Sequence, residues 1–423
     1  MMLSGAIALY AVIGGLPLVG SVLTTQAQQP VNDPGAQLKI VESVLQHIQN
    51  DYVDEPDMNK VRIGALRGLA SGLDPYSSYL TPEQVKEYQA GGAAGKIGIG
   101  AELSQVSGYV YVISVTKGGP AEKAGIKAGD VFEYIDTKAT RDISLYDARQ
   151  AISGDAGTVV SLRVLRSGEK PQTIKVTRGG AKTPVAESRI EDGKIGVIKV
   201  NSLDKGEADD IRSQVQSLAK QGLQKIVLDL RGVAGGSIDE GVTVANLFIK
   251  DGEIAKVLGR EAKVTKTFTA DPSKAAFDGE IAVLIDLGTA GAAEVIAAAV
   301  VERKRGEVIG ERSFGAGTEQ QLFPMSSGGG YLLTVAKWAS PSGTPFFGEE
   351  RSTMGVKPSI EVKRPDTPEP LAVEDLVDRQ TGDPQATPTP SAKPKPVVTE
   401  DIQLKKAIEV LSAVKAAAKT VGE

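Results

Sequence analysis

The chain has 423 residues, of which 41% are hydrophobic and 24% charged, and its formal net charge is −5. These values are typical of a soluble globular protein of two or three domains, without the basic field of a nucleic-acid-binding protein. The absence of cysteine excludes thiol catalysis, disulfides and thiolate metal sites. The one histidine, His47, lies in an amphipathic stretch with no nucleophile beside it. We interpret it as a half-exposed helical residue, and we expect no histidine triad, no metal site and no cofactor.

An apolar N-terminal segment indicates export. Residues 5–23 are almost wholly apolar, and Thr25 and Ala27 fit the small residues that precede a signal-peptidase cut. The basic residues that usually open a signal peptide are absent, since the first basic residue is Lys39, and the apolar run is just long enough to span a membrane. Residues 1–35 are therefore either a signal peptide or a membrane anchor, followed by a short linker. Both alternatives predict a protein in the periplasm or on the outer side of the cytoplasmic membrane.

Three consecutive regions differ in their residue pattern. Residues 36–94 carry apolar residues at helical spacing and predict a small helical domain, in which Thr81 caps a helix that begins with Pro82. Residues 95–180 consist of short β runs with one short helix among them. Residues 184–362 alternate strands with helices, which predicts an α/β core with a partly parallel sheet.

The C-terminal part of the chain has two segments. Residues 363–400 are rich in proline and threonine and predict a disordered linker. Residues 401–423 predict a helix with one apolar stripe. The stripe consists of Leu404, Ala407, Ile408, Leu411 and Val414. A stripe on a terminal helix usually indicates docking on its own protein, and less often a dimer contact.

Residues 281–300 have the layout of a catalytic elbow. An apolar run that ends at Leu287 predicts a buried strand, Gly288 predicts a turn, and residues 294–300 predict a helix. Enzymes place nucleophiles on such strand-to-helix turns, because the free N–H groups of the helix stabilise a nearby anion. Apart from Thr289, however, the turn contains only glycine and alanine.

Two glycine-containing motifs precede this core. "KIGIGAEL" begins at Lys96, and "GGPAEKAGIKAGDVFEYID" begins at Gly118. The glycines that flank Ile99 allow consecutive backbone N–H groups to point into one concavity, which suits a carboxylate. In this order the motifs resemble a PDZ domain, a module that adds the C-terminal strand of a peptide to its own sheet edge. The resemblance assigns peptide binding to Ile97, Gly98, Ile99 and Gly100.

Further blocks resemble the C-terminal processing (tail-specific) peptidases of bacteria and chloroplasts. They are "GLDPYSSYL", "IVLDLRGVAGGSIDEGVTVANLFI", "TVAKWASPSGTPFFGE" and "DIQLKKAIEVL", and they extend the resemblance from about residue 38 to residue 420. The resemblance implies a multidomain α/β protein: an N-terminal helical domain, a PDZ domain over 95–180, a core of the ClpP/crotonase-like type over 184–362, and a C-terminal helix.

The family uses a serine nucleophile and a lysine general base, and the resemblance assigns their positions in this chain. The elbow reads "GAAE", so Gly291 occupies the place of the serine. The loop "SFGAGTEQ" puts Ala316 in the place of the lysine and retains the family's supporting glutamine as Gln320. The family's oxyanion hole would be formed by Gly235, Gly236 and Ala292.

Three functions are compatible with this sequence. The first is an exported pseudopeptidase that binds the C-terminal tails of proteins or peptides through its PDZ domain. The second is an active serine-type peptidase with another nucleophile, such as Thr289 or Ser313, although the closest lysines are only Lys304 and Lys337. The third is a structural partner, either in a homodimer or paired with an active relative.

Overall fold

The computed structural model describes residues 33–92, 95–180, 182–192, 194–365 and 400–419. The expected signal peptide or membrane anchor and nearly all of the expected linker lie outside these ranges. Within them, no helix has the length and apolar character that crossing a bilayer requires. The chain divides into two compact units, one that ends at Leu66 and one that begins at Arg67.

The first unit is helical. It contains α2 (Pro34–Asp51) and most of α3 (Met58–Ser71). No residue of α2 is buried. His47 lies on this helix, as the sequence predicted, but its side chain is exposed rather than half-exposed. Its Nδ1 lies 2.6 Å from the Oδ2 atom of Asp51.

The second unit contains, soon after the end of α3, a strand that the sequence did not indicate. β1 (Ser78–Leu80) pairs antiparallel with residues 330–332, so the region 36–94 is not purely helical. The strand has only three residues and is held by a partner far away in the chain, which a local pattern cannot reveal. After it, α4 (Pro82–Gln89) begins with the predicted cap, in which Thr81 and Gln84 exchange hydrogen bonds.

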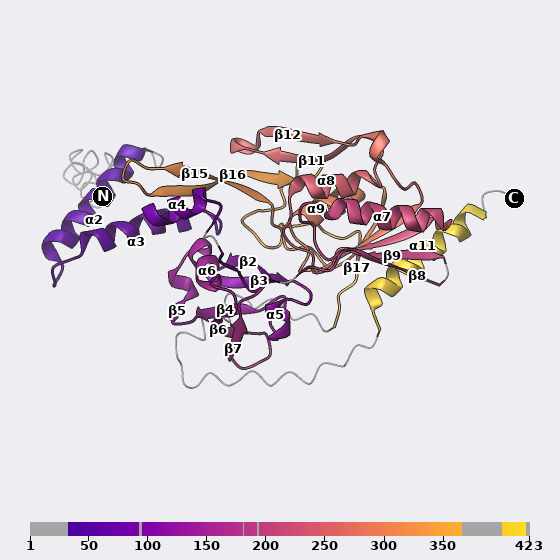
Figure 1. Cartoon of the computed structure of the whole chain (residues 1–423). Helices are drawn as coiled ribbons and strands as arrows, with labels where there is room; N and C mark the ends of the chain where they lie inside the picture. Colours follow the sequence, from indigo (N-terminus) through magenta and orange to yellow (C-terminus); the bar gives the residue numbers. More distant parts are fainter. Residues whose placement is uncertain (1–32, 93–94, 181, 193, 366–399, 420–423) are drawn as a thin grey trace, which may run out of the picture. The chain divides into compact units, whose positions relative to one another are not determined.

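The next domain is a six-stranded sheet with short helices (Figure 1). Its elements are β2 (Ala101–Val106), β3 (Tyr109–Val115), α5 (Pro120–Lys123), β4 (Val131–Ile135), β5 (Lys138–Ala139), a 3-10 turn (Thr140–Asp142), α6 (Leu145–Ile152), β6 (Val159–Leu165) and β7 (Gln172–Thr177). The strand order is β2-β3-β4-β6-β7, with β5 attached to β4. This order leaves β2 at one edge of the sheet.

The α/β core is built on a second six-stranded sheet in the order β17-β14-β13-β10-β9-β8. Its elements are β8 (Glu187–Glu191), β9 (Ile195–Lys199), α7 (Glu207–Lys220), β10 (Lys225–Asp229), α8 (Ile238–Asn246), β13 (Glu280–Ile285), α9 (Ala292–Glu302), β14 (Gly306–Gly310) and β17 (Ile360–Glu361). All neighbouring strands are parallel except β8 and β9. The partly parallel sheet that the sequence predicted is therefore present.

A third, antiparallel sheet completes the unit. It contains β1, β11 (Glu253–Leu258), β12 (Val264–Thr269), β15 (Thr318–Pro324) and β16 (Gly330–Ala339). Strand β16 pairs with β15 along most of its length and also with β1 and β11. Short 3-10 turns at Arg260–Ala262 and Pro272–Lys274 flank β12.

The two faces of the core sheet are covered differently. Ile226 and Leu228 of β10 belong to the hydrophobic cluster formed with α7, α8 and α9, whereas Val227 between them packs in the cluster of α11 (Ile402–Lys419). Successive side chains of a strand point to opposite faces, so α11 covers the face that the other helices leave open. The predicted docking of the terminal helix on its own chain is present in the structure.

Two polar contacts fix α11 on this face. Arg231, two residues after the end of β10, places its Nη2 atom 2.8 Å from Asp229 and 2.7 Å from Asp401. Lys225 donates a hydrogen bond to the carbonyl oxygen of Leu411. Of the predicted stripe, Leu404, Ala407 and Leu411 are buried and Ile408 packs against them. The side chain of Val414 lies outside the described part of the helix.

We expect Leu411→Ala to lower the free energy of unfolding by about 2–5 kcal/mol, because it leaves a cavity under a helix that covers apolar strands. The side chain of Leu411 is 2% exposed. Leu73→Ala makes the same chemical change at a residue that is 65% exposed, and it should change the stability by less than about 0.5 kcal/mol. Urea unfolding of the two variants measures this difference; equal effects would show that α11 does not contribute to stability.

Candidate functional site

The predicted elbow lies between β13 and α9. Helix α9 begins at Ala292, two residues before the sequence pattern suggested, and Gly291 is its N-cap. Gly291 has φ 65° and ψ −118°, a backbone conformation that side-chain-bearing residues adopt only under strain. A Cβ at this position would lie 3.0 Å from the carbonyl oxygen of Gly235. The strained geometry of a nucleophile elbow is thus present at a residue that has no side chain.

A buried carboxylate joins the elbow to the loop before β15. Oε2 of Glu294 accepts hydrogen bonds from the backbone N–H groups of Gly291 and Ala316, both at 2.8 Å. Oε1 accepts from the hydroxyl of Ser313 and from the N–H of Gly315. Glu294 is fully buried, and this burial raises its pKa to about 7 against the opposing effect of the four hydrogen bonds. The sequence did not predict that Glu294 belongs to this site.

Gly291 and Ala316 line one cavity of about 160 Å³. Three other residues singled out from the sequence line it as well, namely Gly235, Gly236 and Gln320. The remaining lining residues are Tyr76, Glu102, Ile113, Arg149, Ala290, Gly317, Thr318 and Trp338. The structure therefore brings together both positions that the family resemblance assigned to the nucleophile and the base. Neither position carries a hydroxyl or an amine.

One of the expected oxyanion donors is engaged elsewhere. The N–H of Ala292 donates to the carbonyl oxygen of Gly235 at a distance of 3.2 Å, and Ala292 does not line the cavity. The expectation for Ala292 is therefore not met in this conformation, because the first turn of α9 uses that N–H to hold the glycine loop. Gly235 and Gly236 remain as candidates for binding a carbonyl or carboxylate oxygen.

The hydroxyls of Thr289 and Ser313, the two alternative nucleophiles, have structural roles. Thr289 is fully buried, and its Oγ1 lies 3.0 Å from both the carbonyl oxygen of Leu230 and the N–H of Asp286. Ser313 is also fully buried, and besides donating to the buried glutamate it accepts from the N–H of Val356 at 2.7 Å. Neither residue lines the cavity, so a peptide in the cavity would not reach these hydroxyls.

The retained glutamine lies in a polar network. Nε2 of Gln320 donates to Oγ1 of Thr318 at 2.7 Å and of Thr334 at 3.2 Å, and the hydroxyl of Thr334 donates to Asp74 at 3.0 Å. This gives "GLDPYSSYL" a structural role, because Asp74 anchors the hairpin that carries Gln320. The closest lysine in sequence on this hairpin, Lys337, places its Nζ 5.2 Å from the centre of the Phe347 ring, and neither Lys337 nor Lys304 lines the cavity.

The predicted carboxylate-binding loop precedes β2. Ile97 exchanges two backbone hydrogen bonds with Gly154 after α6, at 2.8 and 3.0 Å. The carbonyl groups of Gly98, Ile99 and Gly100 accept from the N–H groups of Gly179, Ala121 and Thr116, respectively. The N–H groups of these same three loop residues have no hydrogen-bond partner among the described residues.

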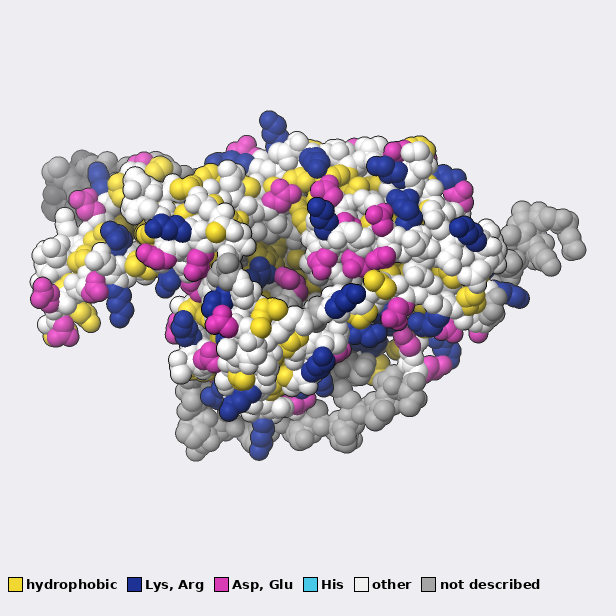
Figure 2. All heavy atoms as spheres, viewed as in Figure 1, with side chains coloured by type: hydrophobic (Ala, Val, Ile, Leu, Met, Phe, Trp, Pro, Cys, Tyr) yellow, Lys and Arg dark blue, Asp and Glu magenta, His cyan; other side chains and the backbone are white. Residues whose placement is uncertain are grey.

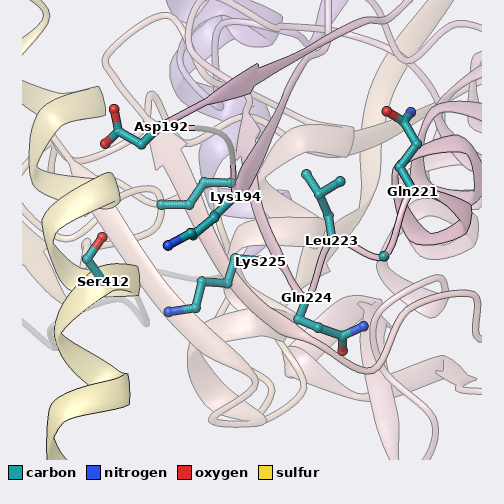
Figure 3. A pocket seen from close by; sticks show the side chains of 9 residues that line it. Asp192, Lys194, Gln221, Leu223, Gln224, Lys225 and Ser412 are labelled. Atoms are coloured by element: carbon teal, nitrogen blue, oxygen red, sulfur yellow. The ribbon is translucent and has the colours of Figure 1, made fainter.

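A larger cavity of about 430 Å³ lies elsewhere in the second unit (Figure 3). Its lining comes from the β8–β9 turn, the α7–β10 turn and α11, and it shares no residue with the cavity at Gly291. In Figure 3 the side chains of Lys194 and Lys225 point toward α11, which carries Ser412. Since Lys225 already binds the backbone of this helix and lies 3.3 Å from Glu280, we interpret the hollow as a consequence of helix docking.

The visible surface carries basic and acidic side chains interspersed, without a continuous field of one sign (Figure 2). The features described above define a class of protein: a peptidase-type α/β core with an elbow between strand and helix, preceded by a PDZ domain. Comparison with known families agrees with this class. Residues 194–362 match the family "Peptidase family S41", and residues 111–166 match "PDZ domain".

Curated relatives extend the similarity over most of the chain. The chain is 32% identical over 366 residues to a "Probable CtpA-like serine protease" of Staphylococcus aureus (strain MSSA476), covering 84% of this chain and 72% of the relative. It is 33% identical over 322 residues to the "Carboxy-terminal processing protease CtpA" of Bacillus subtilis (strain 168), covering 76% and 68%.

A solved structure shows the same architecture. The "Photosystem II D1 C-terminal processing protease" superimposes with a TM-score of 0.63 at 26% identity, covering 78% of this chain and 94% of that protein. This chain belongs to the CtpA-like C-terminal processing proteases of peptidase family S41.

Proposed function

We propose that this protein binds the C-terminal tails of exported proteins through its PDZ domain and does not cleave them. The observation that carries the proposal is the cavity where Gly291 and Ala316 meet around Glu294 without any hydroxyl or amine at either position. A serine-type peptidase needs a nucleophile and a base that act as a unit. The glycine loop of the cavity can bind a carbonyl oxygen, but without a nucleophile no acyl-enzyme forms.

The buried hydroxyls support the same conclusion. Thr289 and Ser313 each hold two backbone or carboxylate partners inside the core. To serve as a nucleophile, either residue would have to break these hydrogen bonds and enter the cavity beside a base. Within the part of the chain that the structure describes, no lysine lines that cavity.

The loop before β2 supports tail binding. Three consecutive N–H groups at residues 98–100 are free among the described residues while the carbonyls on the other side are held. Such a rigid row of donors suits a terminal carboxylate. Charge-assisted hydrogen bonds are worth about 1.5–3 kcal/mol each, but ordering a free peptide tail cancels much of that gain. We expect affinities in the micromolar range or weaker.

The test uses a fluorescent peptide with a free apolar C-terminus and the same peptide amidated. We expect the free peptide alone to bind, and Gly100→Val to abolish binding. Gly100 has φ 75°, and a Cβ there would lie 3.4 Å from Thr116, so valine must distort the loop. Gly222→Val is the control, since that position also has a positive φ of 80° but lies two residues after the end of α7 in the α/β core, outside the PDZ domain. Equal binding of both peptides would favour a structural partner instead.

We also propose that the protein is exported from the cytoplasm. This proposal is supported by the apolar residues 5–23 and the small residues Thr25 and Ala27, as well as by the absence of cysteine. With a cleaved segment the protein would be released into the periplasm. With a retained segment it would be anchored to the outer side of the cytoplasmic membrane.

A further inference from the structure

The edge of the PDZ sheet where a tail would add is already occupied by a side chain of the same domain. Strand β2 is the last strand of its sheet and pairs only with β3 within the described residues. Leu103 lies opposite Val112 of β3, whose own N–H and carbonyl groups bond to Asp130 and Gly129 on the far side of β3. In such a non-hydrogen-bonded pair the carbonyl of Leu103 points away from β3, toward the free edge. A peptide that extends the sheet from the carboxylate-binding loop must use the backbone groups of this edge.

The occupant is Arg149 of α6. Its Nη2 lies 2.8 Å from the carbonyl oxygen of Leu103 and 2.8 Å from Oε1 of Glu102. Glu102 is a β2 residue, so the guanidinium is held by a side chain and by a carbonyl of the same strand. About half of the Arg149 side chain is exposed (48%), and Glu102 is 40% exposed. An ion pair with this much solvent contact is weak, so an incoming strand can displace it.

We propose that Arg149 caps the peptide-binding edge of β2, and that a C-terminal tail must displace its guanidinium from Leu103 in order to bind. This inference rests on the proposed tail binding and adds the residue that regulates it. The cap satisfies an edge carbonyl while the domain is empty, and it also blocks that edge against unspecific strand pairing. When a tail that extends beyond the loop binds, one of its backbone N–H groups replaces the guanidinium as the donor to the carbonyl of Leu103. The hydrogen bond between Arg149 and Leu103 is then broken.

The test measures tail affinity of the full chain by fluorescence anisotropy. Arg149→Ala should bind the free-carboxylate peptide about fivefold tighter than the wild type, since about one net hydrogen bond need no longer be broken. Arg163→Ala is the matched control: it removes the same charge from β6 of the same domain, where Arg163 pairs with Glu133 at 2.8 Å and is 50% exposed. Its affinity should equal that of the wild type.

Two other outcomes have distinct meanings. If Arg149→Ala binds more weakly than the wild type or equally well, while the amidated peptide is still rejected, the cap is overturned and tail binding stands. If neither the wild type nor Arg149→Ala binds the peptide, tail binding itself is overturned and the cap with it. Unchanged thermal midpoints of both variants would show that the domain is folded in each case.

Discussion

The protein should leave peptides with small apolar C-termini intact, and fluorophosphonates should not label it. The reason is the absence of a hydroxyl at Gly291 and of an amine at Ala316 on the cavity they share. Gly291→Ser combined with Ala316→Lys should restore measurable cleavage, whereas each single variant should stay inactive, because nucleophile and base act as a unit worth about 10⁶-fold in rate. Mass spectrometry of the peptide products measures both results.

The strained backbone at residue 291 provides a control on folding. Gly291→Ser should itself lower the stability by about 1–3 kcal/mol, because φ 65° and ψ −118° are strained for a residue with a Cβ. The restored double variant should therefore be compared with Gly291→Ser, not with the wild type. Cleavage by the wild type that disappears in Thr289→Ala or Ser313→Ala would contradict the proposed inactivity and identify another nucleophile.

The stability of the protein should fall as the pH rises from about 4.5 to about 7, because over this range the glutamate ionises in the unfolded state while Glu294 stays protonated in the folded core. Its pKa is raised from 4.5 to about 7 by burial, so the folded state holds this proton more tightly than the unfolded state. The resulting stabilisation is complete below pH ~4.5 and is lost above pH ~7, with a total of about 3 kcal/mol. Urea unfolding between pH 5 and 8 measures most of this change.

Glu294→Gln isolates this effect because the amide does not titrate. The difference in unfolding free energy between the wild type and Glu294→Gln should shrink or change sign as the pH rises. Glu122→Gln is the control, since it removes an exposed carboxylate that accepts a backbone hydrogen bond from Gly118 at 2.6 Å. A constant difference between the wild type and Glu294→Gln from pH 5 to pH 8 would show that Glu294 keeps one ionisation state in the folded protein.

Much of the fold could be predicted from local patterns. The cap at Thr81, the strand before Gly288, the helix after the elbow and the apolar stripe of α11 each depend on residues that are close in sequence. Strand β1 could not be predicted, because its three residues are ordered by β16 more than 200 positions later. Whether Ala292 can act as an oxyanion donor could not be judged from the sequence either. Only the geometry of the turn shows that its N–H donates to the carbonyl oxygen of Gly235.

The sequence by itself determined which chemical groups this protein has: neither hydroxyl nor amine at residues 291 and 316, no cysteine, and a glycine-flanked loop before β2. Only the tertiary structure decided which of the other groups can act. It buried Thr289 and Ser313, gathered four donors around Glu294, and placed Arg149 on the edge carbonyl of Leu103. The physical reason is that burial and hydrogen bonding depend on neighbours brought from distant parts of the chain, which no local pattern specifies.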